Sequence, residues 1–303
     1  MVNITHKNNS LRKAIATAQL TVSSPNTIAA ILEKKVPKGD VYEFSRAAGL
    51  LGIKKTSDVI PDCHPLPVEY ASITHCIEGL TVLITVEVHT IYKTGVEVEA
   101  MHGAAVTALT MYDMLKPIDK GVEISNIRLQ TKTGGKTDLA KYTTDGLRCA
   151  VIVCSDSVTA GTNQDQSGKL IVDKLQKLQL STEVYQVIPD EIAAIQTTAT
   201  QLSEAGIQLV LFTGGTGLSP KDLTPDAIRP LLDREIPGIM EAARNYGQQR
   251  TALAMLSRGV AGFINNMLVI TLPGSPRGVA ESMDALFPYV LHVFKVAEGM
   301  RHD

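Results

Sequence analysis

The apolar positions of residues 12–55 predict one strand followed by two helices. RKAIATAQLTV (12–22) is typical of a strand. SPNTIAAILEKK (24–35) predicts a helix in which Ser24 is the cap and Pro25 the first residue. DVYEFSRAAGLLGIKK (40–55) repeats apolar residues at helical spacing, and Asp40 is expected to cap this second helix.

The next segments predict a hairpin, a long helix and a last strand. Two β-branched runs are separated only by a short turn that contains glycine, which is typical of a hairpin. The order strand, helices, hairpin, helix, strand is that of a split βαβ sandwich, so an α+β domain of ferredoxin-like type is expected. The segments are 68–77 and 80–91 for the hairpin, 95–115 for the helix and 122–130 for the strand.

The second half has a different pattern. Short and almost wholly apolar runs alternate with helical patterns, which indicates an α/β three-layer domain with a mostly parallel sheet. A polar stretch with glycines lies between the halves, so the domains are expected at 1–138 and 147–303 with a linker at 139–146. The four strands are expected at 148–156, 181–190, 208–215 and 267–274.

Composition narrows the class of partner. The chain has 303 residues, 44% of them hydrophobic, and 29 Lys and Arg against 31 Asp and Glu. Neither half has the basic excess that binding to nucleic acid needs, so small-molecule chemistry is favoured. No apolar run approaches the length of a membrane span, and a cytoplasmic protein is expected. The four cysteines lack the C-x-x-C spacing of zinc and redox sites, so reduced and mostly buried thiols are expected.

A glycine loop follows the expected strand 208–215. Gly214, Gly215 and Gly217 allow positive φ and close approach of backbone N–H groups to an anion. The loop is neither a Walker A motif nor G-x-G-x-x-G, and alone it could be a tight turn without a ligand. Other strands end in carboxylates, at Asp156 and Asp190, although an aspartate in this place is often a helix cap. Together with Asp222 beyond the loop, they favour a site for a magnesium–nucleotide complex.

The second half resembles the MogA/MoaB family in SDSVTAG, IPDE, TGGTGLSPKDLTPDA, REIPGIMEAAR and LPGSPRG. Its MogA type is a molybdopterin adenylyltransferase, so the resemblance implies transfer of AMP from Mg-ATP to molybdopterin with release of pyrophosphate. Asp190 and Asp222 match its two functional carboxylates, with Asp222 expected on the Mg²⁺. Ser157 and Lys221 stand where arginine is frequent in the family. The positions expected to contact substrate are Asp156, Gly214, Gly215, Thr216, Gly217 and Ser275.

The first half has 13 Lys and only 3 Arg, and several of these lysines lie at the ends of predicted elements. Lysine can take part in acid–base chemistry when its pKa is depressed, whereas arginine cannot. Asp113 and Lys116 are three residues apart and can meet on one helix face. Such a pair could be an exposed ion pair of little consequence or, in a pocket, a general acid–base pair.

Three long strings of the first half resemble the MoaC family, the cyclic pyranopterin monophosphate synthases. They are KGDVYEFSRAAGLLGIKKTSDVIPDCHPLP, KTGVEVEAMHGAAVTALTMYDMLK and RLQTKTGGK. The resemblance implies conversion of 3′,8-cyclo-7,8-dihydro-GTP into cyclic pyranopterin monophosphate and pyrophosphate. His102 is a departure from the family pattern that could touch the pocket. Catalytic roles are implied for Lys38, His64, Asp113 and Lys116, and binding roles for Lys7, Arg12, Glu97, Glu99 and Lys132.

The two resemblances belong to one pathway, molybdenum cofactor biosynthesis, and together they predict a bifunctional enzyme. They also imply a homo-oligomer with threefold symmetry, namely a hexamer, because both families assemble around threefold axes. No tightly bound cofactor is expected besides the Mg²⁺ that accompanies ATP. Two alternatives remain open for the second half: a pterin-binding or scaffolding module without transfer activity, and a nucleotide-binding regulator in which the aspartates are helix caps.

Overall fold

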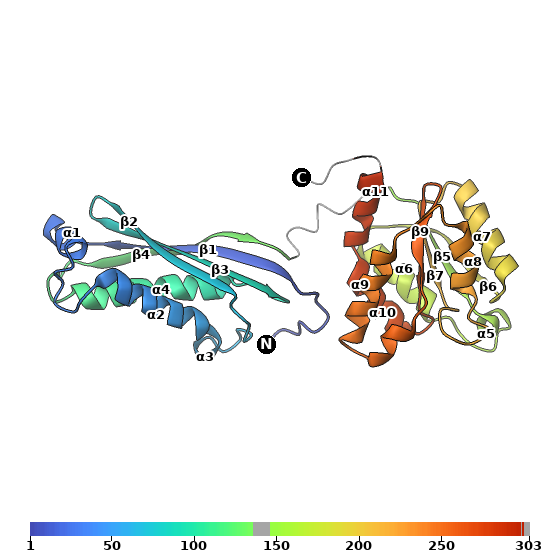
Figure 1. Ribbon diagram of the computed structural model, residues 1–303, viewed down its shortest axis with the longest axis horizontal. Coiled ribbons are helices and arrows are strands. Elements are labelled where there is room, and N and C mark those ends of the chain that lie inside the picture. The colour runs from blue at the N-terminus through green and yellow to red at the C-terminus, as the bar shows by residue number, and fades with distance from the viewer. Residues whose placement is uncertain (136–145, 298, 300–303) are drawn as a thin grey trace. The chain divides into compact units, whose positions relative to one another are not determined.

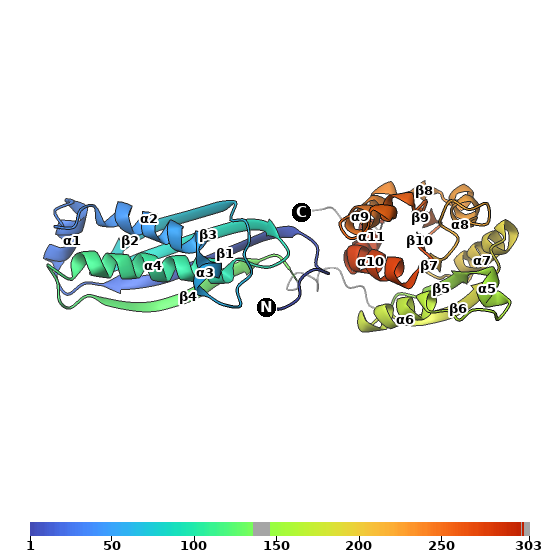
Figure 2. The same ribbon diagram turned by 90° about the horizontal axis from the view of Figure 1, so that it is seen from below.

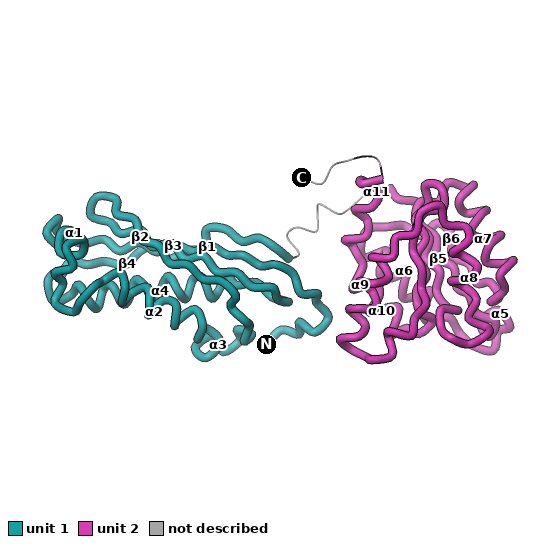
Figure 3. Tube along the Cα trace, in the orientation of Figure 1, with its two compact units in different colours: residues 1–138 teal, residues 139–303 magenta. Residues whose placement is uncertain are grey.

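A computed structural model of the chain describes residues 1–135, 146–297 and 299. The chain divides into two compact units, residues 1–138 and 139–303 (Figure 3). Nearly all of the linker expected at 139–146 lies outside the described residues. Each unit is therefore considered by itself.

Unit 1 contains one antiparallel sheet of four strands in the order β2-β3-β1-β4 (Figure 1). The hairpin joins two neighbouring strands, and the first strand lies at the centre, between the third and the last. This order is that of a ferredoxin-like fold, so the predicted class is confirmed. The strands are β1 (Ser10–Thr21), β2 (Tyr70–Glu78), β3 (Thr81–Tyr92) and β4 (Glu123–Thr133).

Helices α2 and α4 cover one face of this sheet, as Figures 1 and 2 both show. Small residues let the two helices approach closely: a Cβ on Gly103 would lie 2.5 Å from Ile53 Cγ1, and one on Gly49 would lie 2.1 Å from Thr107 Oγ1. This contact fixes α4, which carries the expected site residues Glu97, Glu99 and Asp113. The helices are α1 (Pro25–Leu32), α2 (Val41–Lys54), α3 (Thr56–Val59) and α4 (Glu97–Leu115).

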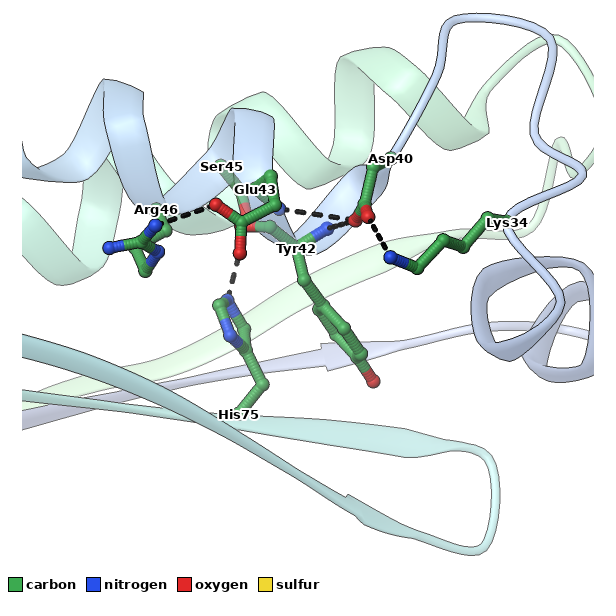
Figure 4. Close-up of polar contacts among 7 residues, drawn as sticks. All are labelled: Lys34, Asp40, Tyr42, Glu43, Ser45, Arg46 and His75. Atoms are coloured by element: carbon green, nitrogen blue, oxygen red, sulfur yellow. Dashed lines mark hydrogen bonds and ion pairs between the residues drawn. The ribbon is translucent and has the colours of Figure 1, made fainter.

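The start of α2 is held by Asp40, as predicted. Its Oδ1 accepts from the backbone N–H groups of Tyr42 and Glu43 at 3.1 and 3.2 Å, and its Oδ2 pairs with Lys34 Nζ at 2.8 Å (Figure 4). Gly39, with φ +104°, supplies the turn that precedes the helix. The expected site residue Lys38 thus lies directly before a pinned helix start.

Unit 2 contains a mixed sheet of six strands in the order β6-β5-β7-β10-β9-β8. The first four are parallel, whereas β9 and β8 are antiparallel to their neighbours. The mostly parallel sheet is confirmed, and the two antiparallel strands were not predicted. The strands are β5 (Cys149–Cys154), β6 (Thr182–Ile188), β7 (Leu209–Thr213), β8 (Arg234–Glu235), β9 (Ala261–Ile264) and β10 (Met267–Leu272).

Helices cover both faces of the second sheet, which explains why β5, β7 and β10 are buried at every position (Figure 2). One core packs under α6 (Ser167–Lys177), α9 (Pro237–Gln248) and α10 (Pro276–Leu286). The other packs under α7 (Ile192–Glu204) and α8 (Thr224–Ile228). The remaining helices are α5 (Asp156–Thr159) and α11 (His292–Ala297), with single turns η2 (Arg229–Leu231), η3 (Ala252–Leu256) and η4 (Tyr289–Leu291).

The cysteines differ from the prediction in one respect. All four are free, but only Cys149 and Cys154, on the central strand β5, are buried. Cys63 is half-buried, and Cys76 is exposed because it lies on the edge strand β2. Among the helices of the described residues, none combines the length and the apolar character needed to cross a bilayer.

Candidate functional site

The glycine loop after β7 lies at the carboxyl ends of the parallel strands, where ligands bind in open α/β sheets. Gly214 has φ +103°, and a Cβ there would lie 2.1 Å from the backbone oxygen of Cys154. Gly215 has φ +60°, and its Cβ would collide with Thr224 Oγ1 and Asp190 Oδ1 at 2.5 and 2.8 Å. Glycine is therefore required by both conformation and space at these two positions.

The loop presents unused backbone donors. Gly214 N donates to Leu272 O at 3.2 Å. Within residues 1–135 and 146–297, by contrast, no acceptor is bound by the N–H groups of Gly215, Thr216 or Gly217. Three successive free N–H groups are the feature that phosphate-binding turns use.

Asp190 is not a helix cap. The residue before α7 is Glu191, and no side chain bonds the first turn of that helix. The Oδ1 atom of Asp190 is buried without a hydrogen-bond partner in the described part of the chain, and so is Thr224 Oγ1. Burial raises the pKa of Asp190, and the nearby carboxylates of Asp156 and Asp222 raise it further. A cation or a hydrogen-bond donor from a ligand would relieve both effects.

The other two aspartates support the loops around Asp190. Asp156 Oδ1 accepts from the backbone N–H of Asp190 at 3.0 Å and thereby joins the ends of β5 and β6. Asp222 Oδ2 accepts from the backbone N–H of Ser219 at 2.8 Å, and a Cβ on Gly217 would lie 2.9 Å from the same oxygen. The missing side chain at Gly217 thus leaves room for the carboxylate of Asp222.

A cavity of about 360 Å³ opens beside these loops. Its walls include Asp190, Gly214 and Gly215 from the predicted site, together with Gly274 of the loop after β10. A Cβ on Gly274 would lie 3.2 Å from Gly214 Cα, so the two loops approach closely. Asp156, Thr216, Gly217 and Asp222 do not line this cavity.

Ser275 has a structural role in the free chain. Its Oγ accepts from the backbone N–H of Gly278 at 3.1 Å and caps α10. It lines a neighbouring cavity of about 300 Å³ between α9, η3 and α10. Ser157, the departure in the loop after β5, is exposed, and its Oγ lies 3.2 Å from Ser155 Oγ.

Arg258 holds the glycine loop through hydrogen bonds to its backbone oxygens. The sequence analysis did not predict this role. Its backbone N–H donates to Thr216 O at 2.9 Å, and its Nε donates to Gly217 O at 2.8 Å. Nη2 donates to the backbone oxygen of Asp222, and Nη1 pairs with the carboxylate of Asp226 at 2.9 Å. The available signal was an arginine directly before a buried apolar run. Interpreting that signal would have required the direction of strand β9, which was not predicted.

In unit 1, the structure brings Lys38, Asp113 and Lys116 together. Asp113 Oδ2 lies 2.6 Å from Lys38 Nζ, and its Oδ1 lies 2.7 Å from Lys116 Nζ. The side chains are 39%, 52% and 50% exposed, respectively. Hydrogen bonds from Lys116 and then Lys38 lower the pKa of Asp113 to about 2, and the same contact raises the pKa of Lys116. The pKa of Lys116 is therefore raised, not depressed as a general base would require.

A second polar group lies at the other end of α4. Lys132 Nζ is 3.1 Å from Glu97 Oε1, and Lys132 pairs across the sheet with Ala14. Arg12, nearby on β1, donates from Nε to Tyr92 O at 3.4 Å. Gly135 has φ +88°, a conformation that explains a glycine after β4.

Glu99 is 3% exposed and faces Cys63, whose Sγ donates to Glu99 Oε1 at 3.2 Å. Burial raises the pKa of Glu99 and raises that of Cys63 to about 12. Glu99 Oε2 is buried and lacks a partner among the described residues. An uncompensated buried carboxylate is typical of a site that receives a polar ligand.

The remaining residues singled out in unit 1 make other contacts. His64 Nε2 is 2.8 Å from the backbone oxygen of Val2. Lys7 is half-buried in the N-terminal segment, and in the described residues no ion pair joins it to another expected site residue. His102 Nδ1 lies 3.1 Å from Thr56 Oγ1 and so contacts α3.

The described residues contain no group of three or more His, Cys, Asp or Glu side chains arranged to hold a metal ion. A magnesium ion bound with a nucleotide does not need such a group, because one or two carboxylates and the phosphates are its usual ligands. Asp190 and Asp222 meet that smaller requirement.

Comparison with known proteins identifies the families of the two units. The profile of the MoaC family matches residues 1–135, and that of a "Probable molybdopterin binding domain" matches residues 150–292. A molybdenum cofactor biosynthesis bifunctional protein of Chlorobaculum tepidum is 39% identical over 302 residues, covering 100% of this chain and 96% of the relative. One of Synechococcus elongatus is 35% identical, covering 92% of each chain.

A relative of the first unit alone is also similar. The cyclic pyranopterin monophosphate synthase of Listeria monocytogenes serotype 4a is 45% identical over 142 residues, covering 46% of this chain and 88% of that protein. Because the similarity to the two-domain proteins extends over nearly all of both chains, the chain belongs to the family of bifunctional molybdenum cofactor biosynthesis proteins, with a MoaC domain followed by a molybdopterin-binding domain of MogA/MoaB type.

Proposed function

We propose that unit 1 converts 3′,8-cyclo-7,8-dihydro-GTP into cyclic pyranopterin monophosphate with loss of pyrophosphate. The supporting observation is the contact of Asp113 with both Lys38 and Lys116, at 2.6 and 2.7 Å. Lys116, whose pKa is raised by Asp113, is protonated at neutral pH and can donate a proton to the substrate. The ionised Asp113 orients both ammonium groups.

The second polar group of unit 1 suits the phosphates of that substrate. Arg12 and Lys132 lie at neighbouring positions of the sheet, and Lys7 precedes the same strand β1. A triphosphate would replace Glu97 as the partner of Lys132. Glu99, buried and incompletely bonded, would accept a donor of the pterin precursor, with His64 as a further binding or acid–base group.

The test of unit 1 is a coupled assay on the purified full chain. Native protein should release pyrophosphate from the cyclised GTP, and the pterin product is identified by mass spectrometry. Lys116→Met should lose at least about a hundredfold in rate, as expected for removal of a general acid. Lys55→Met, which removes an exposed lysine paired with Asp58, is the control and should retain the native rate.

We propose that unit 2 adenylylates molybdopterin. A phosphate oxygen of the pterin attacks the α-phosphorus of ATP, the bond to the β-phosphate breaks, and pyrophosphate leaves with the electron pair. The observation that carries this proposal is a pair of buried oxygens, Asp190 Oδ1 and Thr224 Oγ1, that have no partner among the described residues. They lie beside a loop with three N–H groups that bind no acceptor in the same part of the chain. Transfer of this kind needs positioned donors and neutralised charge rather than a protein nucleophile.

Mg²⁺ fits the residues present. Asp190 is kept from easy ionisation by burial and by two neighbouring carboxylates, and a cation would offset that repulsion. Asp222 and Asp190 would hold the ion together with the nucleotide phosphates. Bound there, it would neutralise phosphate charge and orient the phosphate chain. The N–H groups of Gly215 and Thr216, which bind no acceptor in the described residues, would then donate to phosphate oxygens.

The decisive experiment is incubation of the full chain with Mg-ATP and molybdopterin, followed by mass spectrometry of the adenylated pterin. Asp222→Asn should reduce the rate at least about a hundredfold, because one charged ligand is lost. Asp233→Asn is a matched control, because Asp233 lies directly before the edge strand β8, away from the glycine loop. Pterin binding without product in the native chain would favour the alternative of a binding module.

We also propose an assembly with threefold symmetry, a hexamer in the simplest case. The side chains of Lys38, Asp113 and Lys116 are about half exposed in the single chain. Acid–base chemistry on a small substrate requires shielding from water. A second chain would supply that cover. Native mass spectrometry of the purified protein tests the proposal, and a monomer that turns over both substrates would refute it.

A further inference from the structure

A second, basic cavity lies behind the glycine loop of unit 2. It measures about 380 Å³ and is bounded by η2, β8, the first half of α9 and the segment before β9. Arg229, Arg244 and Arg258 line it, together with a single carboxylate, Glu235. None of these residues was assigned to a site by the sequence analysis.

The charges of this cavity are incompletely neutralised. Glu235 Oε1 lies 3.4 Å from Arg229 Nη2. Asp226, which pairs with Arg258, does not line the cavity. Arg244 has no carboxylate partner within the described residues. Its Nη1 reaches only the backbone oxygens of Ser257 and Gly259, both at the long distance of 3.5 Å. Even with Asp226 counted, the arginines therefore exceed the carboxylates by one.

Arg244 has capacity for a ligand. A guanidinium has five donors, and in the described part of the chain neither Nε nor Nη2 of Arg244 has an acceptor. The side chain is half-buried, which makes an unpaired charge costly and favours an anion beside it. Its planar fork suits two oxygens of one phosphoryl group.

The surroundings favour an anion with more than one phosphoryl group. Arg229 and Arg258 are on the walls beside Arg244, so two guanidinium groups can share neighbouring phosphates. The first residue of α9, Pro237, also lines the cavity, and no side chain caps that helix. The positive end of the helix dipole adds to the attraction. Glu235 opposes an anion and limits its affinity.

We propose that this cavity binds a diphosphate group, either inorganic pyrophosphate or the β,γ end of a nucleotide. The assignment rests on the proposed adenylyl transfer, which releases pyrophosphate. Through Arg258, which bonds Gly217 and Asp222, an occupant of the cavity is coupled to the loop that would hold the α-phosphate. Arg244 also lines the adjacent cavity that contains Ser275.

Hydrogen–deuterium exchange of the full chain tests the proposal, because exchange is localised in the sequence and separates this cavity from the basic groups of unit 1. Inorganic pyrophosphate should protect peptides that cover residues 229–244 and 256–259. In Arg244→Gln the concentration needed for protection should rise at least about tenfold, or about 1.4 kcal/mol. Glu235→Gln should lower that concentration, an effect that misfolding cannot produce.

Separate arms of the experiment identify the source of the diphosphate. Protection by pyrophosphate alone assigns the free product, and protection by ATP but not pyrophosphate assigns the nucleotide; either outcome supports the site. Equal protection by inorganic phosphate at matched ionic strength, or no difference between native protein and Arg244→Gln, overturns it. No pterin is present, so failure of adenylyl transfer would not alter these results.

Discussion

Arg258 donates a hydrogen bond to the backbone oxygen of Asp222, and so the segment before β9 supports the aspartate expected to bind magnesium. The same guanidinium reaches Gly217 O and Asp226. The glycine loop therefore owes its shape to a residue just before β9, the antiparallel strand that pairs with β10. Both ligand binding by the loop and the stability of unit 2 should therefore depend on Arg258.

Arg258→Gln should destabilise the protein by roughly 1.5–3 kcal/mol, the range for hydrogen bonds of a charged group. Urea unfolding followed by circular dichroism measures the loss. The KM for ATP should rise more than kcat falls, because the residue positions the loop without touching the reacting atoms. Arg258→Lys should recover little of either, since a lysine cannot bond three acceptors in one plane. An unchanged KM would contradict the role.

Gly214→Ala should be strongly destabilising, by roughly 2 kcal/mol or more, because positive φ and a contact with Cys154 O both oppose a Cβ. Gly238→Ala is the matched control. Gly238 is at the start of α9 with no atom within 4 Å of the added carbon, and alanine there should be neutral or stabilising by up to about 1 kcal/mol. Thermal unfolding of both variants measures the difference, and equal melting temperatures would refute the strain.

Asp190→Asn should stabilise unit 2 at neutral pH while abolishing adenylyl transfer. The pKa of Asp190 is raised by burial, so the folded state favours the protonated form. Its contribution to stability is present below the ordinary carboxyl pKa and is lost as the pH rises through the raised value. The advantage of the asparagine variant should consequently appear above that value and vanish in acid. Melting temperatures across pH 4–8 give the comparison, and a less stable variant at pH 7 would argue against it.

Asp113→Asn should leave the melting temperature unchanged and reduce synthase activity. The ion pairs of Asp113 are exposed, so their loss has little effect on folding. Since the pKa of Asp113 is lowered to about 2, the native rate should not depend on this group between pH 5 and 8. A fall in activity at pH 5 that disappears in the variant would show that Asp113 titrates there.

Thiol labelling separates the four cysteines. Cys76 is exposed and should react first with iodoacetamide at pH 7.5. Cys63, Cys149 and Cys154 should react slowly, because burial raises the pKa of each to about 12. Peptide mass mapping identifies the modified site, and Cys76→Ser should abolish the fast phase. Fast labelling of Cys63 would mean that Glu99 is not covered as the structure has it.

The helices and central strands were predictable from the sequence because their patterns are local. Ser24 and Asp40 cap the helices that their positions indicated, and the expected hairpin forms, with its turn at Gly79 and Leu80. The short strands β8 and β9 were missed. Residues Arg234 and Glu235 form a two-residue strand that only its pairing with β9 defines, and no periodicity can exist over two positions.

The site was predictable to a different degree. The spacing of Asp113 and Lys116 indicated their contact, but Lys38 joins them from 75 residues away, which only the packing of α2 on α4 brings about. The resemblance to known families named Asp190 and Asp222, yet it gave no reason for the burial of Asp190 Oδ1. Arg258 and Thr224 were outside both kinds of argument, because their contacts depend on where β9 starts and on a missing Cβ at Gly215.

The reversed direction of β9 also limits how this loop can be engineered. A contiguous graft of residues 214–226 onto another parallel sheet would leave the carbonyls of Thr216, Gly217 and Asp222 without their common donor. The part that must be transferred is thus discontinuous. It consists of two segments separated by more than thirty residues of chain. Recombination between relatives should tolerate crossovers on either side of the whole 214–258 interval and fail within it.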